Sequence, residues 1–296
     1  MFDNIVGNEK LKRTLETSVN LNRTSHSYLF IGIQGIGKKL LATEFAKRIL
    51  CLEDKQSCQC KSCIEFEGNN NPDFMCIEPD GNSIKIEQIR YLQKKIQEKP
   101  ILSNKKVYII NEADTMKDAA QNCLLKTLEE PPEYATIILI CSNEDNLLST
   151  IKSRCTRMHF EPINIELVKK YIKEKYPEEE ISENIINLSQ GSIGKILKLN
   201  ENKNIYENIE KIFLNMQNKD LVEIIQMAEE IYKAKEEISS ILDYMNVILL
   251  KLSKQNIKYI RCIEIVEETK KRLKVNSNYD MCIDNLLFNM TFIIHN

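Results

Sequence analysis

The feature that most constrains the fold of this chain is a glycine-rich loop at residues 32–39, with the sequence GIQGIGKK. It contains the spacing G-x-x-x-x-G-K, in which backbone N–H groups surround phosphate oxygens and the lysine reaches the terminal phosphates. An apolar run at residues 28–31 precedes the loop, and a helical pattern begins at Lys38. Because a strand, this loop and a helix follow one another, the segment predicts a P-loop α/β fold rather than a chance glycine-rich turn.

Two positions that normally hold the metal ion of such a site have changed. The pattern requires a Ser or Thr hydroxyl after the lysine, and this chain has Lys39 there. The apolar run at 107–110 ends in Asn111 and Glu112, where an aspartate normally holds the ion. An ammonium cannot ligate Mg²⁺ and an amide brings no charge, so we predict a degenerate site in which hydrolysis is largely lost. Residual ATP binding stays open, because the phosphate-binding residues are kept: Gly32, Gly35, Gly37 and Lys38.

The composition is that of an ordinary soluble globular protein. Of the 296 residues, 43% are hydrophobic and 28% are charged, and the formal net charge is −2. This balance gives no basic signature, so nucleic acid is not expected as a direct ligand. The first residues lack a signal-peptide pattern, and no apolar run approaches the roughly 18–20 residues of a membrane span. We therefore expect a cytoplasmic chain with reduced thiols.

Short apolar runs alternate with helical patterns through the first half of the chain. Strands are expected at residues 28–31, 73–77, 107–110 and 136–141, with a further short one at 158–160. Helices between them are expected at about residues 8–20, 38–50, 86–98 and 116–129. Because the strands are almost continuously apolar and helices separate them, the pattern predicts an α/β fold with a parallel sheet covered on both faces.

The distribution of glycine and proline divides the chain. All seven prolines lie before residue 178, and all eight glycines lie before residue 195. The remainder predicts helices with few interruptions, since turns and strands usually bring one of these residues. With a boundary at Glu161-Pro162, we expect a P-loop domain at residues 1–161, a small helical domain at 162–203 and an all-α domain at 204–296.

Four of the ten cysteines are clustered at residues 51–63, in a short polar insertion after the helix that follows the glycine-rich loop. Four thiolates at this spacing suit tetrahedral Zn²⁺, and a metal would organise a loop that is too short to bury a core of its own. The alternative is a set of free or redox-active thiols, the less common arrangement in a reducing compartment. The predicted zinc ligands are Cys51, Cys58, Cys60 and Cys63.

Two further segments carry polar groups that could act at a phosphate. Ser153, Arg154 and Cys155 follow the last strong strand pattern by about a dozen residues. An arginine at the edge of a sheet can reach a phosphate on a neighbouring molecule, although a solvated surface arginine is the commoner case. Asn143 follows the strand pattern at 136–141, where its amide either orients a water or a γ-phosphate or serves as a turn residue.

Several segments occur together in the order found in one protein family. With the cysteine cluster, they resemble the bacterial clamp-loader proteins of the AAA+ class. The resemblance is strong from residue 1 to about residue 160 and weaker beyond. The segments that carry it are HSYLF at 26–30, the glycine-rich loop, EAD at 112–114, LLKTLEEPP at 124–132 and Ser153-Arg154-Cys155.

The resemblance implies a particular assembly and role. Clamp loaders of this kind are pentameric, hetero-oligomeric rings of the DNA polymerase III holoenzyme, a DNA-directed DNA polymerase, and they load the sliding clamp onto primed DNA. The implied partners of this chain are the gamma/tau motor subunits and the delta subunit. Arg154 is implied to act as an arginine finger on ATP bound by the adjacent motor subunit. Residues 162–203 correspond to the lid domain, and residues 204–296 correspond to the collar that joins the ring.

The departures from the motif decide between subunit types. Lys39 and Asn111 favour a non-hydrolysing subunit over a gamma/tau-like motor subunit, whose loops end in Gly-Lys-Thr or Gly-Lys-Ser. The main alternative is an active ATPase that uses Lys38 and Glu112 despite these changes, and it would turn over ATP as the isolated chain. A zinc-dependent DNA-binding module is a third class, which requires salt-sensitive DNA binding. The near-neutral charge disfavours this third class.

Overall fold

The computed structural model describes residue 2 and residues 4–53, 58–216, 218, 221–275 and 277–295, with the side chains of residues 214 and 227 outside the description. The chain forms two compact units. The first comprises Met1–Ile172 with Gly191–Gly194, and the second comprises Lys173–Gln190 with Lys195–Asn296. The expected division into three domains, with boundaries after residues 161 and 203, stays a prediction.

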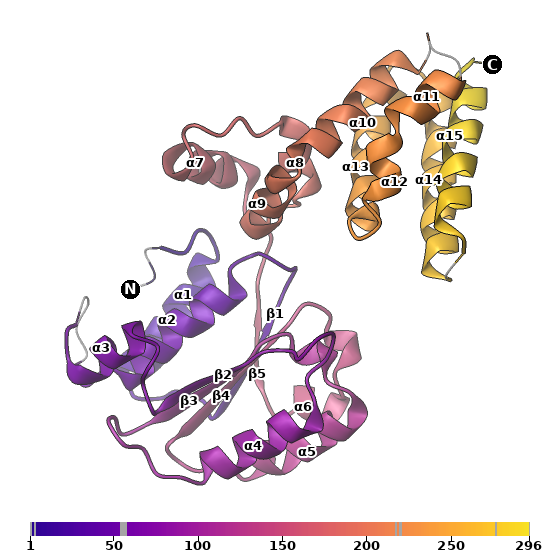
Figure 1. The fold of residues 1–296 in the computed structure, drawn as a ribbon. Helices are drawn as coiled ribbons and strands as arrows, with labels where there is room; N and C mark the ends of the chain where they lie inside the picture. The colour runs from indigo at the N-terminus through magenta and orange to yellow at the C-terminus, as the bar shows by residue number, and fades with distance from the viewer. Residues whose placement is uncertain are drawn as a thin grey trace. The chain divides into compact units, whose positions relative to one another are not determined.

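A five-stranded parallel sheet forms the centre of the first unit (Figure 1). It lies in the order β2-β3-β4-β1-β5, and every neighbouring pair is parallel. The strands are β1 (Ser27–Ile31), β2 (Phe74–Ile77), β3 (Lys106–Ile110), β4 (Ala135–Cys141) and β5 (Thr156–His159). The parallel α/β sheet predicted from the sequence is confirmed, and its strands fall at the predicted apolar runs.

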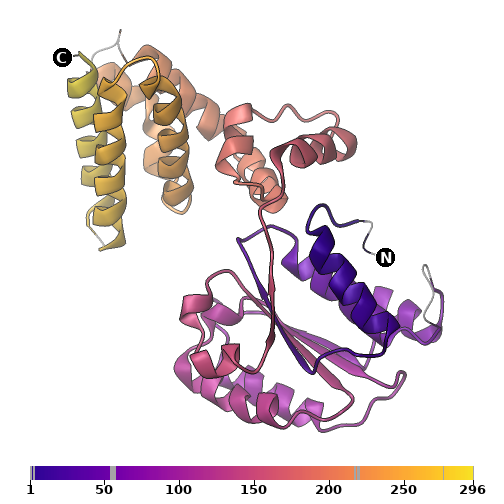
Figure 2. The same cartoon turned by 180° about the vertical axis from the view of Figure 1, so that it is seen from behind.

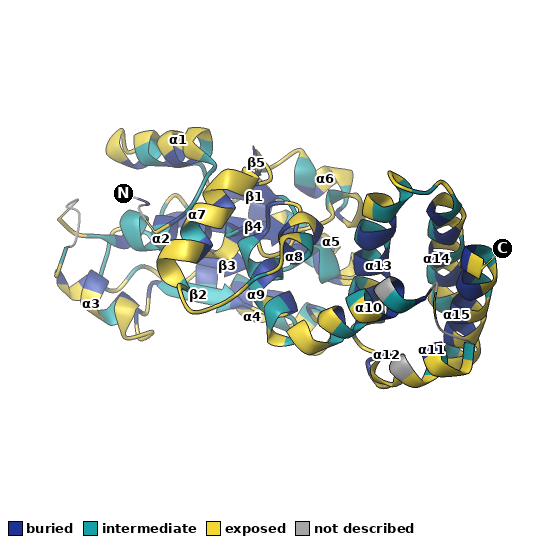
Figure 3. Ribbon diagram, turned by 90° about the horizontal axis from the view of Figure 1, so that it is seen from above, coloured by how far each residue is buried: buried dark blue, intermediate teal, exposed yellow. Residues whose placement is uncertain are grey.

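Helices cover both faces of this sheet, as Figures 1 and 2 show. On one face lie α1 (Glu9–Asn20) and α2 (Lys38–Leu50), and on the other lie α4 (Ile86–Ile96) and α5 (Asp118–Glu129). The side chains of β1, β3 and β4 are all buried, because these strands are covered from both sides (Figure 3). Their nearly continuous apolar sequences reflect this double cover.

One hydrophobic cluster fixes the sheet against α4 and α5. Ile89, Leu92 and Ile96 of α4 and Leu124 of α5 are fully buried in it, together with residues of β1, β3 and β4. Burying a side chain of this size contributes about 1.5–3 kcal/mol. The cluster therefore holds the strands in fixed register, and it fixes the positions from which the loops at both ends of the sheet begin.

The sequence analysis did not predict four short helical elements that lie beside the candidate site residues. They are α3 (Lys61–Glu67), η1 (Ala113–Thr115), η2 (Glu144–Asn146) and α6 (Ser149–Lys152). Each has seven residues or fewer, too few to show a helical period. In addition, α4 ends at Ile96 and α5 begins at Asp118, so both are shorter than the ranges predicted.

The second unit is built from helices and connecting turns in its described residues. The helix α7 (Ile165–Lys175) runs across the boundary between the units. The helices that follow are α8 (Glu183–Leu188), α9 (Ile193–Glu201), α10 (Lys203–Asn215), α11 (Leu221–Met227), α12 (Glu229–Lys233), α13 (Ile238–Ser253), α14 (Lys258–Lys274) and α15 (Tyr279–His295). The last three pack side by side and bury Leu249, Val266 and Leu286 (Figures 1 and 2). The predicted helical C-terminal region is confirmed, and none of the described helices is long and apolar enough to cross a membrane.

Candidate functional site

The glycine-rich loop lies at the carboxyl end of β1 and opens α2. Gly35 and Gly37 have φ angles of 76° and 96°, left-handed values that suit glycine. Gly32 is needed for a different reason, because a Cβ there would lie 2.8 Å from the Cβ of Phe160. Together with residues that follow β3 and β4, the loop lines a cavity of about 280 Å³. This is the edge of a parallel sheet at which α/β folds place their ligands.

Lys38 is buried within the loop and makes its hydrogen bonds there. Only 6% of its surface is exposed. Its Nζ donates to the carbonyl oxygens of Gly32 and Ile33, the latter at 2.8 Å, and to Ser142 Oγ at 3.3 Å. Burial lowers the pKa of Lys38, although nearby acidic groups such as Asp114 oppose the shift. The ammonium group is thus directed into the loop, between the carboxyl ends of β1 and β4.

The two changed metal positions are joined by a residue that the sequence analysis did not single out. Glu78 follows β2, and its Oε1 lies 2.8 Å from Nζ of Lys39. Its Oε2 accepts a hydrogen bond of 2.8 Å from Nδ2 of Asn111. One carboxylate therefore binds the ammonium of Lys39 and the amide of Asn111 at the same time. The available signal was an acidic residue directly after the strand predicted at 73–77.

This contact keeps both charges in place at neutral pH. The hydrogen bond with Glu78 raises the pKa of Lys39. Burial alone would raise the pKa of Glu78, but hydrogen bonds from Lys39 and Asn111 outweigh it and the net shift is downward. Both side chains are about half exposed, at 56% and 44%, so the pair contributes at most about 1 kcal/mol to stability. An ammonium and a neutral amide therefore stand where the ion requires oxygen ligands and negative charge, and these residues do not fit Mg²⁺.

Asp114 ties the loops after β3 and β4 together. Its Oδ2 accepts hydrogen bonds from the backbone N–H groups of Ser142 at 3.2 Å and Asn143 at 2.9 Å. Glu112 precedes η1 with a φ of 51° and lines the cavity beside the glycine-rich loop. Asn143 accepts a 3.0 Å hydrogen bond from the N–H of Asp145 and so caps η2. Asn143 is thus a turn residue in this structure, and its role at a γ-phosphate stays a prediction.

The segment at residues 191–194, whose last two residues begin α9, also contacts the glycine-rich loop. Ser192 Oγ donates to the carbonyl of Gln34 at 2.8 Å, and the N–H of Gly194 donates to the carbonyl of Gly35 at 2.9 Å. A Cβ on Gly194 would lie 2.9 Å from Cα of Gly35. Glycine at position 194 is therefore what allows the two backbones to approach this closely.

Ser153, Arg154 and Cys155 lie at the opposite edge of the sheet. They precede β5, and Ser27 at the start of β1 donates a 2.6 Å hydrogen bond from its Oγ to the carbonyl of Arg154. The glycine-rich loop instead follows the carboxyl end of β1. Because β1 and β5 are parallel and the five residues of β1 span about 16 Å, Arg154 lies far from this chain's own loop.

The side chain of Arg154 is held at the surface. Its Nη2 lies 2.6 Å from Oε1 of Glu129, and its Nη1 donates to the carbonyl of Thr150 at 2.9 Å. Ser153 Oγ donates to the same carbonyl at 3.1 Å. Burial raises the pKa of Cys155 to about 11, so this residue is a neutral thiol packed against the core. The three residues thus present one partly exposed cation on a fixed backbone.

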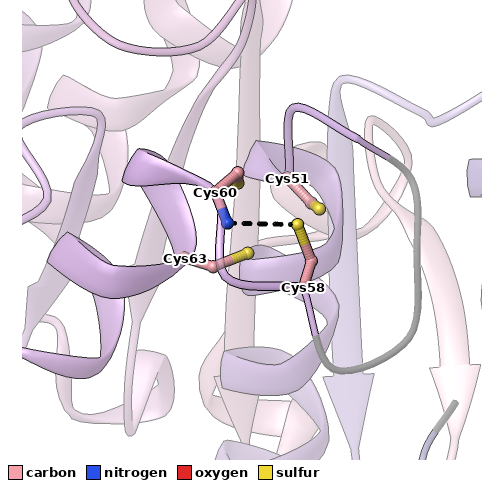
Figure 4. Close-up of side chains that lie close together, drawn as sticks. All are labelled: Cys51, Cys58, Cys60 and Cys63. Carbon is pink, nitrogen blue, oxygen red and sulfur yellow. Dashed lines mark hydrogen bonds between the residues drawn. The ribbon is translucent and has the colours of Figure 1, made fainter.

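The four clustered cysteines face one another (Figure 4). Their Sγ atoms all lie within 4.8 Å of one another, and four Zn–S bonds of about 2.3 Å would place them about 3.8 Å apart. Cys51 follows α2, Cys58 and Cys60 precede α3, and Cys63 lies within α3. Burial alone would raise the pKa of Cys60, but hydrogen bonds, including those from the backbone of Leu52 and Cys63, lower it to about 7. The group can hold a metal ion through four sulfur ligands.

The fold and the loop together define the class of protein. A parallel sheet with a glycine-rich loop after β1 is the P-loop α/β architecture, and a helical C-terminal region follows it in this chain. A DNA polymerase III gamma subunit-related protein from Thermotoga maritima has a similar structure, with a TM-score of 0.59 and 18% identity. The similarity covers 95% of this chain and 99% of that one. At this level of identity it concerns the fold alone.

The sequence comparisons identify the family. Residues 7–164, just over half of the chain, match the family described as DNA polymerase III, delta subunit, and the chain belongs to this family. The DNA polymerase III subunit delta' of Bacillus subtilis is 35% identical over 208 residues, which cover 69% of this chain and 62% of that protein. The predicted resemblance to clamp-loader proteins is thereby confirmed.

Subunits with other names are also similar. The tau subunit of Bacillus subtilis is 36% identical over 169 residues, which cover 56% of this chain and 30% of that protein. The tau/gamma subunit of Haemophilus influenzae is 32% identical over 209 residues, which cover 68% of this chain and 30% of that protein. The chain therefore spans less than two thirds of the length of these relatives.

We expect the affinity of the isolated chain for ATP to be the same with and without added Mg²⁺, because Glu78 holds the ammonium of Lys39 where a metal ligand is required. Isothermal titration calorimetry in the two buffers measures this. The matched variant carries Lys39→Thr with Asn111→Asp, which restore a hydroxyl and a carboxylate, and its affinity should rise with Mg²⁺. A wild-type affinity that rises about tenfold or more with Mg²⁺ would contradict this interpretation.

Proposed function

We propose that this chain is a delta-prime subunit of a bacterial DNA polymerase III clamp loader and that it completes the ATP site of a neighbouring subunit. The family match and the similarity to delta' of Bacillus subtilis support the subunit assignment. In this proposal Arg154, within the segment Ser153, Arg154 and Cys155, acts as an arginine finger in trans. Its guanidinium stabilises the negative charge that develops on the γ-phosphate during hydrolysis.

The position of Arg154 at the amino edge of the sheet is the observation that supports this role most directly. The chain's own glycine-rich loop lies at the carboxyl edge, so a phosphate that Arg154 contacts belongs to another molecule. The Arg154 side chain is 33% exposed, while Ser27 fixes its backbone. An arginine that supplies charge across an interface needs both properties, an accessible guanidinium and a rigid base.

The chain's own nucleotide site is proposed to be inactive in hydrolysis. Lys39 and Asn111 both bind Glu78, and neither supplies the charge that neutralises the phosphates through a metal ion. The alternative is a gamma/tau-like ATPase that uses Lys38 and Glu112, and the 32–36% identity to tau and tau/gamma relatives favours it. That alternative requires a metal site that residues 39 and 111 do not form.

The proposed partners follow from the subunit assignment. They are the gamma/tau motor subunits and the delta subunit in a pentameric ring, which acts on the sliding clamp and primed DNA. Residues 162–203 would form the lid and residues 204–296 the collar. Met281, Phe288 and Phe292 are exposed at helical spacing on α15 and suit helix–helix contacts in such a collar.

We further propose that the cysteine cluster holds a structural Zn²⁺ ion. Four sulfur ligands would complete a tetrahedral site and leave no open position for catalysis. The ion would join the end of α2 to the start of α3, through Cys51 and Cys63 among others. The helix α2 begins in the glycine-rich loop, so the metal would stabilise the same element at its other end.

Replacing the proposed finger should slow the neighbouring site. Arg154→Ala is expected to lower the DNA-stimulated ATPase rate of the reconstituted clamp loader by about tenfold or more, because arginine fingers contribute about 10³–10⁵ to the rate. Steady-state ATPase assays with sliding clamp and primed DNA measure this, and size-exclusion chromatography confirms that the ring has assembled. The control is Arg157→Ala, an exposed arginine on β5 whose Nε donates to the carbonyl of Lys152. An unchanged rate for Arg154→Ala in an intact ring would eliminate the trans role.

The zinc proposal predicts how much metal the purified chain contains and that replacing a ligand releases it. Purified chain is expected to contain about one Zn²⁺, and Cys63→Ser should release it and lower the unfolding temperature, because structural zinc contributes folding free energy. Elemental analysis and differential scanning calorimetry measure the two quantities. Cys262→Ser, at a buried cysteine of α14 outside the cluster, should keep the metal. A stable wild-type chain that contains no metal would disprove the proposal.

A further inference from the structure

We infer that Glu129 is a positioning residue for Arg154, an inference that rests on the proposed trans role of that arginine. The two side chains form an ion pair with 2.6 Å between Glu129 Oε1 and Arg154 Nη2. Glu129 is the last residue of α5, and Arg154 follows the short helix α6. The pair therefore connects the ends of two helices that meet at the amino edge of the sheet.

The backbone of Arg154 is fixed independently of its side chain. Its carbonyl accepts the hydrogen bond from Ser27, and its N–H donates to the carbonyl of Ile151 at 3.0 Å. The next residue, Cys155, packs against the hydrophobic cluster under α4 and α5. The Cα of Arg154 is thus held in place, whereas the long side chain beyond it has several rotatable bonds. The position of the guanidinium depends on the groups that it contacts.

Besides a long contact of 3.5 Å from Nη1 to Ser153 Oγ, two groups restrain the guanidinium in different ways. The carbonyl of Thr150 accepts from Nη1 at 2.9 Å, but it belongs to the same turn as Arg154 and also accepts from Ser153 Oγ. Glu129 comes from a separate element and brings a full negative charge. The charge-assisted contact to Nη2 is the one that directs the guanidinium towards the end of α5.

The packing and the termination of α5 fix the position of Glu129. The helix α5 is held to the sheet by Leu124 and Leu128, both buried. Its regular hydrogen bonding stops after Glu129, and Pro131 and Pro132 prevent the helix from continuing. The carboxyl end of the helix dipole adds negative potential, which also favours a cation there.

The geometry favours a role for Glu129 in orienting Arg154 towards a phosphate over one in which it holds the arginine away from a phosphate. The side chains are 33% and 49% exposed, and an exposed ion pair of this kind is worth at most about 1 kcal/mol. A guanidinium has five N–H donors, so it can bind the Glu129 carboxylate and a phosphate on different edges at the same time. Because Glu129 restricts the rotamers of Arg154 beforehand, less conformational entropy is lost when the transition state forms.

The test is the ATPase rate of the complete reconstituted clamp loader with Glu129→Gln, which removes the charge and keeps the shape. We expect kcat to fall by about twofold to fivefold with KM for ATP and ring assembly unchanged. Glu129→Asp keeps the charge on a shorter side chain and should retain part of the lost rate. The matched control is Glu130→Gln, the adjacent acidic residue at the end of α5, which should behave as wild type.

A double-mutant cycle shows whether Glu129 acts through Arg154. In the Arg154→Ala background, Glu129→Gln should cause no further loss of kcat, because the group that it positions is already absent. An equal loss in both backgrounds would mean that Glu129 acts elsewhere, and the inference would be wrong. A higher kcat for Glu129→Gln would mean that the pair restrains the arginine, and this result also overturns the inference.

The two proposals fail in different ways. If Arg154→Ala lowers kcat while Glu129→Gln does not, the trans role stands and only the positioning role of Glu129 is lost. If Arg154→Ala leaves kcat unchanged in an assembled ring, the trans role is wrong and the inference about Glu129 is wrong with it.

Discussion

The parallel pairing of β1 with β4 and β5 determines where the candidate groups of the sheet lie. In a parallel sheet all carboxyl ends share one edge, so the glycine-rich loop meets the residues that follow β2, β3 and β4. The segments that enter the strands share the other edge, and Arg154 precedes β5 there. If β5 ran in the opposite direction, Arg154 would lie beside the loop of its own chain. Strand direction alone therefore separates Arg154 from the glycine-rich loop of the same chain.

Glu78 joins Lys39 and Asn111, the two changed metal positions, in one local structure. Lys39 without a partner would add a second cation beside Lys38, and the mutual repulsion would disfavour both. With Glu78 between them, Lys39 and Asn111 connect the start of α2 to the ends of β2 and β3. A metal-bound nucleotide would bridge similar elements in a working site. The chain thus obtains a similar cross-link from side chains, without any requirement for a ligand.

The sequence predicted those features that depend on local pattern. Continuous apolar runs located the strands of the buried sheet, and spacing alone located the glycine-rich loop and the four neighbouring cysteines. The contacts of Glu78 and Glu129 could not be found in this way. Glu78 meets Asn111 because β2 and β3 are neighbours, and Glu129 meets Arg154 because two helix ends converge. Such contacts depend on strand order and helix length, which hydrophobic periodicity does not determine.

The close approach of Gly194 to Gly35 shows that the glycine-rich loop also serves as a packing surface for the backbone of residue 194. Larger side chains at position 194 would collide with the loop backbone, and a side chain at position 32 would collide with Phe160. These glycines are therefore constrained by packing even if nucleotide turnover has disappeared. In a lineage of such chains, substitutions would accumulate at the metal ligands well before they were tolerated at the glycines. The presence of these glycines therefore indicates a packing requirement of the fold, and it is weak evidence for enzymatic activity.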